Sequence, residues 1–345
     1  MKIRNKNYAI LLFDSIVYTV ALVVFDINSV IPVFLKELGY PELMPVVDSI
    51  KQLGFFLPQI IVMRYVAVTK DPVNFVTLIM KIDRPQLLLL PVMIFLGFTN
   101  WLIAGAFLIC YGIFVFGEGT ILLYWMDLLG KSTTTKQRST FFGFSQFIAG
   151  IFAALIGYYI STKISSNFEI GSLDFMPIFV IGAVILLPSI FIFPFLRIKA
   201  KGFIRKRDEL KAHKILIHDK NFRNLLFVQV LISFLALGYP FYMLYILDLN
   251  PVFAGNVGLL TFVSICGTVL GGVVWGSTSL LYGNKKTIQG VAIANLSIPI
   301  MFLFISSGSA ANIQLVIAAL SFLLLGMVIG GWLGFVNYIM EITDD

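Results

Sequence analysis

The sequence predicts an all-α membrane protein built of two parallel pseudo-repeats of six transmembrane helices, the second lacking its last two. Three observations predict this fold class. The chain is unusually apolar, its apolar residues fall into ten stretches of helical length, and its first part matches its last part at one fixed offset. About ten helices are therefore expected.

Composition places the chain in a membrane. Of its 345 residues 59% are hydrophobic and 12% are charged, and the mean hydropathy is +0.93. A soluble domain carries about 25% charged residues, so one core cannot bury this much apolar surface. The net charge of +7 does not indicate a nucleic-acid partner, because the basic residues lie in short segments between apolar stretches. That distribution is typical of membrane topology.

Ten apolar stretches are candidates for helices that cross a bilayer core, which needs about 20 residues. They are 8–34, 47–68, 85–99, 101–128, 139–162, 175–197, 223–247, 253–279, 287–307 and 313–338. Phe98, Thr99 and Asn100 leave only a tight turn between the third and fourth stretches. These two helices are therefore expected to form an antiparallel hairpin.

The distribution of Lys and Arg predicts the orientation. With the N-terminus in the cytoplasm, only Lys36, Lys51 and Lys163 fall outside, while Lys81 and Arg84 fall in an inner loop. Both termini are then cytoplasmic, in a protein integral to the cytoplasmic (inner) membrane and in contact with its lipid. The basic segment 198–222 is interpreted as a cytoplasmic linker that lies against anionic headgroups; a regulatory docking site is the alternative.

An internal repeat appears when the chain is shifted by 214 residues. Lys6-Asn7-Tyr8 then matches Lys220-Asn221-Phe222, and Gly112 and Gly117 meet Gly326 and Gly331. The predicted domains are a six-helix bundle at 1–197, the linker at 198–222 and a four-helix bundle at 223–345. Because the second copy stops after four spans, we expect a twelve-span protein truncated after its tenth helix; a natural ten-span protein is the alternative.

This architecture resembles the major facilitator superfamily. A loop motif of that family between spans eight and nine is similar to Gly276, Gly283, Lys285 and Lys286 of this chain, with Leu280 in place of the acid. The first copy of the motif, between spans two and three, is essentially absent. The resemblance implies transport of a small-molecule substrate by alternating access, between halves lined by spans one, four, seven and ten, with no cofactor.

Three carboxylic acids lie inside predicted spans, where ionisable residues are costly and mark candidate functional sites. They are Asp14, Asp26 and Glu118. Glu118 and Asp14 lie at similar depth, and desolvation favours a protonated carboxyl group, so Glu118 is a candidate for proton coupling. A plain hydrogen bond to a neighbouring helix is the alternative. Asp26, beside Asn28, fits a polar cluster at the outer mouth. No Lys or Arg is expected deep in a span to pair with these acids.

Aromatic and polar residues of spans seven and ten are candidates for a substrate cavity. Tyr242 and Tyr245 lie in span seven, and Trp332 and Asn337 in span ten. Their rings suit stacking on a sugar or an aromatic substrate. Tyr and Trp also gather at membrane interfaces, so an interfacial belt is the alternative.

An enzyme is not expected. The two histidines, His213 and His218, lie in the basic linker, and no catalytic or phosphate-binding motif is present. Cys110 and Cys266 are too few for a metal cluster. The predicted function is therefore secondary active transport, with proton coupling as a hypothesis. A transporter-like sensor or scaffold without transport is the alternative.

Overall fold

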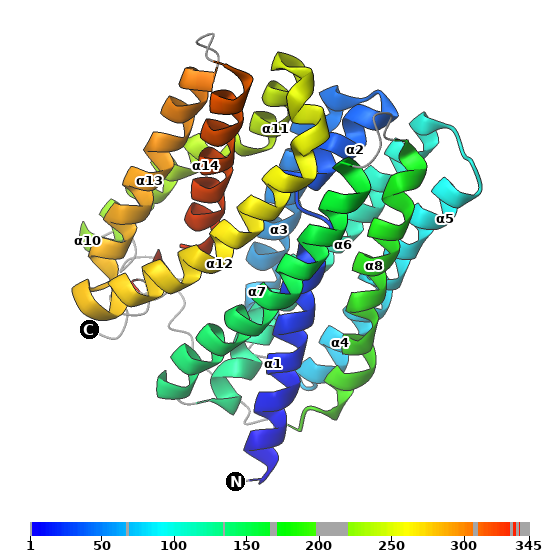
Figure 1. The fold of residues 1–345 in the computed structure, drawn as a ribbon. Helices are drawn as coiled ribbons and strands as arrows, with labels where there is room; N and C mark the ends of the chain where they lie inside the picture. The colour runs from blue at the N-terminus through cyan, green and yellow to red at the C-terminus, as the bar shows by residue number, and fades with distance from the viewer. Residues whose placement is uncertain are drawn as a thin grey trace. The chain divides into compact units, whose positions relative to one another are not determined.

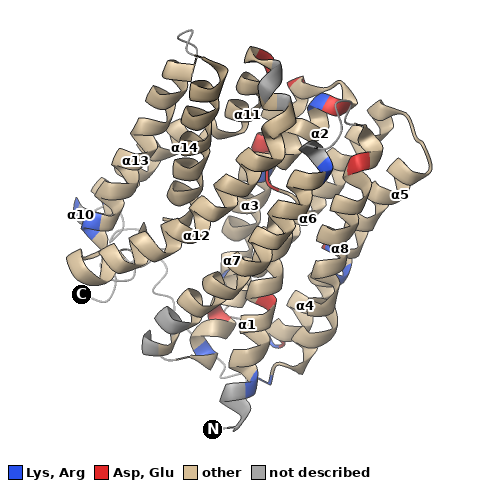
Figure 2. Cartoon of the chain, viewed as in Figure 1, with Lys and Arg blue, Asp and Glu red and all other residues tan. Residues whose placement is uncertain are grey.

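The structure, a computed structural model, describes residues 2–66, 69–133, 135–165, 171–197, 220–305, 310–331, 334, 335 and 338. Every regular element in these ranges is helical (Figure 1), which confirms the all-α prediction. Eight of the described helices are long and apolar enough to cross a membrane. Figure 2 shows long helical stretches without a charged residue, as lipid contact requires. The chain is thus an integral membrane protein with several spans.

The chain divides into two compact units, the first made of Met1–Ile156 and Glu169–Ile204 and the second of Gly157–Phe168 and Arg205–Asp345. Of the predicted linker 198–222, residues 198–219 lie outside the described residues. The helices of the first unit are α1 (Lys2–Leu22), α2 (Val30–Leu38), α3 (Met44–Val66), α4 (Pro72–Asp83), α5 (Leu89–Phe95), α6 (Asn100–Ser132), most of α7 (Thr135–Ser165) and α8 (Ser172–Ile192). Those of the second unit are α10 (Lys220–Ala236), α11 (Tyr239–Leu249), α12 (Val257–Tyr282), α13 (Asn284–Ile305) and α14 (Ala311–Gly330).

The third predicted span, 85–99, is wrong at its start. The helical segment begins at Pro72 and runs through α4, a 3₁₀ turn at Pro85–Leu88 and α5 to Phe95. Asp71 caps α4 by accepting a hydrogen bond from the Asn74 N–H at 3.1 Å, and Pro72 suits the first helical position. Pro85 interrupts the α-helix because it has no N–H to donate. Lys81 and Arg84 therefore lie within this span and not in an inner loop.

The predicted hairpin between the third and fourth spans is confirmed. α5 ends at Phe95 and α6 begins at Asn100, and the two helices pack against each other. Gly97 makes this short connection with a φ of 68°, in the left-handed region that glycine enters without steric cost.

The first span of each unit is broken at a matching point. α1 ends at Leu22 and α2 resumes at Val30, while α10 ends at Ala236 and α11 resumes at Tyr239. Leu22 and Ala236 are 214 residues apart, which is the offset of the sequence repeat. The starts of α3 and α12, at Met44 and Val257, are 213 residues apart. Helix ends thus recur at nearly the spacing that the sequence repeat predicts.

Glycines allow close packing of α12 against α14 in the second unit, where α12, α13 and α14 lie side by side (Figure 1). A Cβ atom at Gly326 would collide with the Ser264 carbonyl oxygen of α12, and one at Gly330 would come within 2.6 Å of the Thr268 carbonyl oxygen. Small residues permit such backbone contact between membrane helices, where the hydrophobic effect gives little drive to associate. In the first unit Gly112 faces Ile50, the position that matches Ser264 at the repeat offset.

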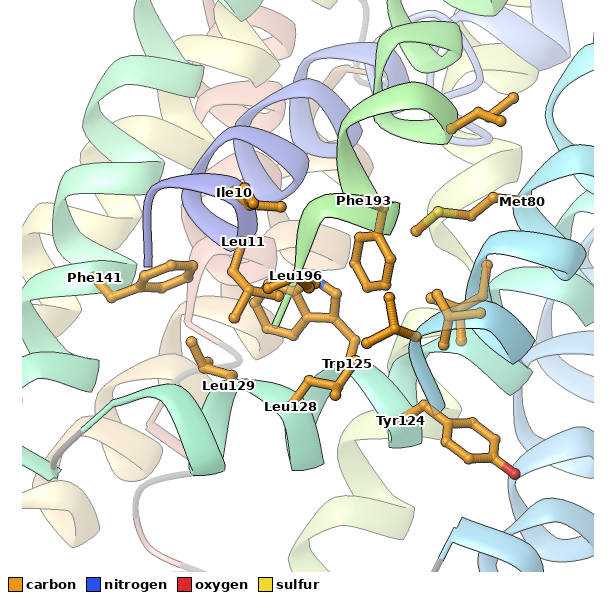
Figure 3. Close-up of a cluster of buried hydrophobic side chains, with 14 residues drawn as sticks. Ile10, Leu11, Met80, Tyr124, Trp125, Leu128, Leu129, Phe141, Phe193 and Leu196 are labelled. Carbon is orange, nitrogen blue, oxygen red and sulfur yellow. The ribbon is translucent and has the colours of Figure 1, made fainter. Parts of the chain in front are cut away.

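An apolar core holds α1, α4, α6 and the end of α8 together in the first unit. Figure 3 shows part of it, including Leu11 of α1, Met80 of α4, Trp125 of α6 and Phe193 after α8. All four side chains are buried. This core fixes the three helices whose polar residues form the candidate site.

Candidate functional site: a buried charge cluster in the first unit

An arginine lies buried inside the membrane-spanning part of the first unit. Arg84 follows the last residue of α4 and precedes Pro85, and its exposed fraction is 1%. At about 1.5 Å per residue it lies roughly 18 Å along the helix from Pro72, near the middle of a bilayer core. A charge at this depth is costly, so it marks a candidate functional site.

Arg84 binds carboxylates from two other helices. Its Nη1 donates to Asp14 Oδ1 of α1 at 3.2 Å. Its Nε and Nη2 both donate to Glu118 Oε1 of α6, at 3.2 and 3.1 Å. Asp14 and Glu118 are themselves buried, so the cluster joins α1, α4 and α6 through charge-assisted hydrogen bonds in a low-dielectric setting.

A tryptophan completes the partners of Asp14. Trp125 Nε1 of α6 donates to Asp14 Oδ2 at 2.9 Å, so each oxygen of Asp14 accepts from a different donor. The indole ring of Trp125 belongs to the apolar core of Figure 3. The core thereby orients the donor that holds Asp14.

Asp83, next to Arg84 in the chain, has a different environment. Its exposed fraction is 1%, and neither of its side-chain oxygens has a hydrogen-bond partner among the described residues. The side chain lies against the backbone of α6 at Gly117, where an added Cβ atom would stand 2.7 Å from Asp83 Cβ. A residue larger than glycine at position 117 would displace it.

The charges of the cluster do not cancel. One guanidinium faces the carboxylates Asp14 and Glu118, and Asp83 is a third acid in the same place. If all three acids were ionised, the site would hold three negative charges and one positive charge. Burial makes such an excess unfavourable, so at least one acid is held in its neutral form. The arrangement is therefore able to take up and release a proton.

The structure brings two of the three predicted acids together and corrects one expectation. Asp14 and Glu118 meet at Arg84, although the sequence had indicated that no Lys or Arg pairs with them. Arg84 was missed because the third span was begun one residue after it. A span of 15 residues is only about 22 Å long, shorter than a bilayer core of about 30 Å, and this deficit was the signal that placed Arg84 inside.

Asp26 lies apart from this cluster, in the break between α1 and α2. Its Oδ1 accepts from Asn28 Nδ2 at 3.1 Å and its Oδ2 from Ser29 Oγ at 2.6 Å. The predicted association with Asn28 is thus present. These local bonds satisfy polar groups where the helix is interrupted.

The two predicted cavity tyrosines lie on α11 and face an aromatic residue of α13. Tyr242 stacks on Phe302 with ring centroids 4.2 Å apart, and Tyr245 meets the same ring edge-on at 6.5 Å. One face of Tyr242 is therefore already covered. Trp332 and Asn337 lie outside the described residues. Whether these four residues line a substrate cavity stays a prediction.

The loop that resembles the family motif joins α12 to α13. Gly283 ends α12 with a φ of 86°, a conformation that favours glycine. Lys285 and Lys286 are exposed in the first turn of α13, and Gly276 has open space around its Cα. Among the described residues, no group of three or more His, Cys, Asp or Glu is placed to hold a metal ion.

Comparisons with known proteins show similarity of fold. No protein-family model matches the chain, and no curated protein matches it. Among solved structures, the xylose transporter XylE from E. coli, in a partially occluded inward-open conformation, has a TM-score of 0.63 at 14% identity, over 99% of this chain and 85% of that one. A point mutant of the nucleoside transporter NupG has a TM-score of 0.65 at 15% identity, covering 95% and 80%. A D-xylose-proton symporter has a TM-score of 0.63 at 14% identity, covering 94% and 78%.

Proposed function

We propose that this chain, which has the major facilitator transporter fold and not that of an enzyme, is a secondary active transporter. In this proposal it moves a small molecule across the cytoplasmic membrane by alternating access and couples that movement to protons. The observation that carries the proposal is the buried contact of Arg84 with Asp14 and Glu118. A buried ion pair is weak evidence for stability, which favours a functional reason for its presence.

Proton coupling fits the chemistry of the cluster. Carboxylic acids change charge when they gain or lose a proton, and a change of charge beside Arg84 alters its hydrogen bonds to α1 and α6. Protonation at this site can thus bias the relative position of three helices. Conversely, a conformational change that alters the contacts of Arg84 changes the affinity of the site for protons, because the two effects are reciprocal.

A neutral polar compound is the substrate class that we favour. The similar structures are described as transporters of xylose and of nucleosides, and one as a proton symporter. Arg84 is already bound by two carboxylates, so it does not serve as a clamp for an anionic substrate. Sugars and nucleosides suit hydrogen bonding and stacking, the chemistry that Tyr242 and Tyr245 offer.

We further propose that the two units are copies of one repeat, with both ends of the chain in the cytoplasm. The matching breaks after Leu22 and Ala236 support the repeat. Single cysteines introduced before α1 and between α12 and α13 should react with an impermeant thiol reagent only from the cytoplasmic side. Reaction at either position from the outside would contradict this topology.

Transport is tested with the full chain in proteoliposomes. Labelled D-xylose and uridine are the probes, with an imposed pH gradient and a protonophore as the control that removes it. We expect one probe to accumulate with the gradient and to equilibrate without it. Glu118→Gln, which removes one of the charges at Arg84, should weaken the dependence on the gradient. Retention of full pH dependence in Glu118→Gln argues against coupling through this cluster. Folded protein that moves neither probe favours a sensor or scaffold.

A further inference from the structure

We propose that Asp83, and not Glu118 or Asp14, holds the exchangeable proton of the buried cluster. This inference rests on the proposed function for its role in transport, but the protonation itself is measurable without any substrate. No feature of the sequence singled out Asp83, because the residue was assigned to a loop.

The three acids differ in their partners. Both oxygens of Asp14 accept hydrogen bonds, from Arg84 and Trp125, and Glu118 accepts two from Arg84. Asp83 accepts none that meets hydrogen-bond geometry; its own N–H and that of Arg84 interact with it only electrostatically. A buried carboxylate without such partners costs several kcal/mol, whereas a neutral acid costs far less. Asp83 is therefore the acid that must carry the proton in this conformation.

The charges around Asp83 lead to the same conclusion. The charged and titratable side chains that act on it or lie in the same cluster are Glu118 of α6, Asp14 and Tyr18 of α1, and Arg84. α8 also packs against α4, but its only charged residue is Asp174 in its first turn. Arg84 is the one cation of this cluster, and two carboxylates already bind it. The surroundings of Asp83 thus carry an excess of negative charge, which favours its neutral form.

Gly117 explains how this acid stays without a donor. The Asp83 side chain lies flat against the α6 backbone at this glycine, and the N–H groups of a helix interior are already bonded within the helix. The position is close-packed and offers no hydrogen bond to a charged oxygen. It suits a neutral acid group.

Release of the proton links this residue to movement. The Asp83 O–H bond breaks, the proton passes to a water molecule that enters in a more open conformation, and a carboxylate remains. The nearest cation is Arg84, its neighbour in the chain. Pairing with Asp83 draws the guanidinium away from Glu118 or Asp14, which loosens the contact of α4 with α6 or α1. Uptake of a proton reverses these steps.

The test is infrared difference spectroscopy of the purified full chain in lipid, without substrate, between acid and alkaline pH. We expect a carbonyl stretching band of a protonated carboxylic acid that shifts in D₂O. Asp83→Asn, close in shape to the neutral acid, should remove this band, and Asp83→Leu should remove it too. In Glu118→Gln the band should remain but titrate at lower pH, because Arg84 is then freer to pair with Asp83. Asp127→Asn, at the partly exposed ion pair with Lys131, is the matched control and should leave the band unchanged.

Several outcomes would overturn the assignment. They are the absence of the band in the wild type, its persistence in Asp83→Asn, and its loss in Glu118→Gln. None of these results depends on transport, so failure of flux with D-xylose and uridine leaves the measurement valid. Conversely, flux in Asp83→Asn that keeps its full dependence on the pH gradient refutes the role of Asp83 while the transport proposal stands.

Discussion

Removal of the Arg84 guanidinium is the sharpest test of how the first unit is held together. Arg84→Met keeps a long apolar side chain but leaves Asp14 and Glu118 buried without their shared cation. Three hydrogen bonds are lost, each worth about 1.5–3 kcal/mol to a charged partner, or about 5–9 kcal/mol in all. The acids can take up protons instead of remaining charged. We therefore expect a loss near about 3–5 kcal/mol, the usual cost of breaking a buried pair.

The assay is the free energy of unfolding of the purified chain in mixed micelles of a mild detergent and SDS, compared with the wild type. The loss should shrink as the pH falls, because proton uptake by Asp14 and Glu118 removes the unpaired charges. The triple variant Arg84→Met, Asp14→Asn, Glu118→Gln removes all three charges together and should recover at least half of the lost stability. It also serves if Arg84→Met alone fails to fold.

Two results would refute this reasoning. If Arg84→Met is as stable as the wild type, the guanidinium does not hold α1, α4 and α6 together. If the triple variant is no more stable than Arg84→Met, the cost does not come from unpaired charge. Arg84→Lys separates charge from geometry, because an ammonium has no planar fork with which to bind two carboxylates at once. An intermediate loss is expected.

Three further substitutions test other contacts, each by thermal unfolding in detergent. Gly326→Val forces a side chain against the Ser264 carbonyl and should cost about 1–3 kcal/mol; an unchanged midpoint would mean that α12 and α14 are not in backbone contact. Trp125→Phe keeps most of the ring but removes the donor to Asp14, and we expect a loss of about 1.5–3 kcal/mol, with no loss if Asp14 has already been changed to Asn. Gly283→Ala places a side chain at positive φ and should cost about 1–2 kcal/mol, unless the end of α12 relaxes without penalty.

The sequence was sufficient for the fold class because lipid imposes simple demands. Long apolar stretches must be helices in a bilayer, and the short turn at Phe98–Asn100 left the hairpin no other geometry. Glycines spaced along predicted spans eight and ten indicated close packing, and the structure pairs α12 with α14 at those residues. Such local and periodic signals survive without knowledge of neighbours.

The charge cluster required information that a single stretch does not contain. Asp14 and Glu118 were found because each acid stands alone in an apolar stretch. Asp83 and Arg84 were missed because Lys81, Asp83, Arg84 and Pro85 together look like the end of a loop. The broken span can hold them only because α1 and α6 supply opposite charge and a glycine surface at the same depth. That compensation is a property of the packed unit.

The cluster also bears on how the two halves of the sequence diverged. At the repeat offset, Asp14, Asp83, Arg84 and Glu118 correspond to Val228, Ser297, Ile298 and Trp332. No position of the cluster keeps a charge in the second copy. A requirement of the repeat fold itself would be expected in both copies, so the four charged residues mark a specialisation of the first. If the copies arose by duplication, their division of labour can be read at these four positions, with ionisable chemistry confined to one.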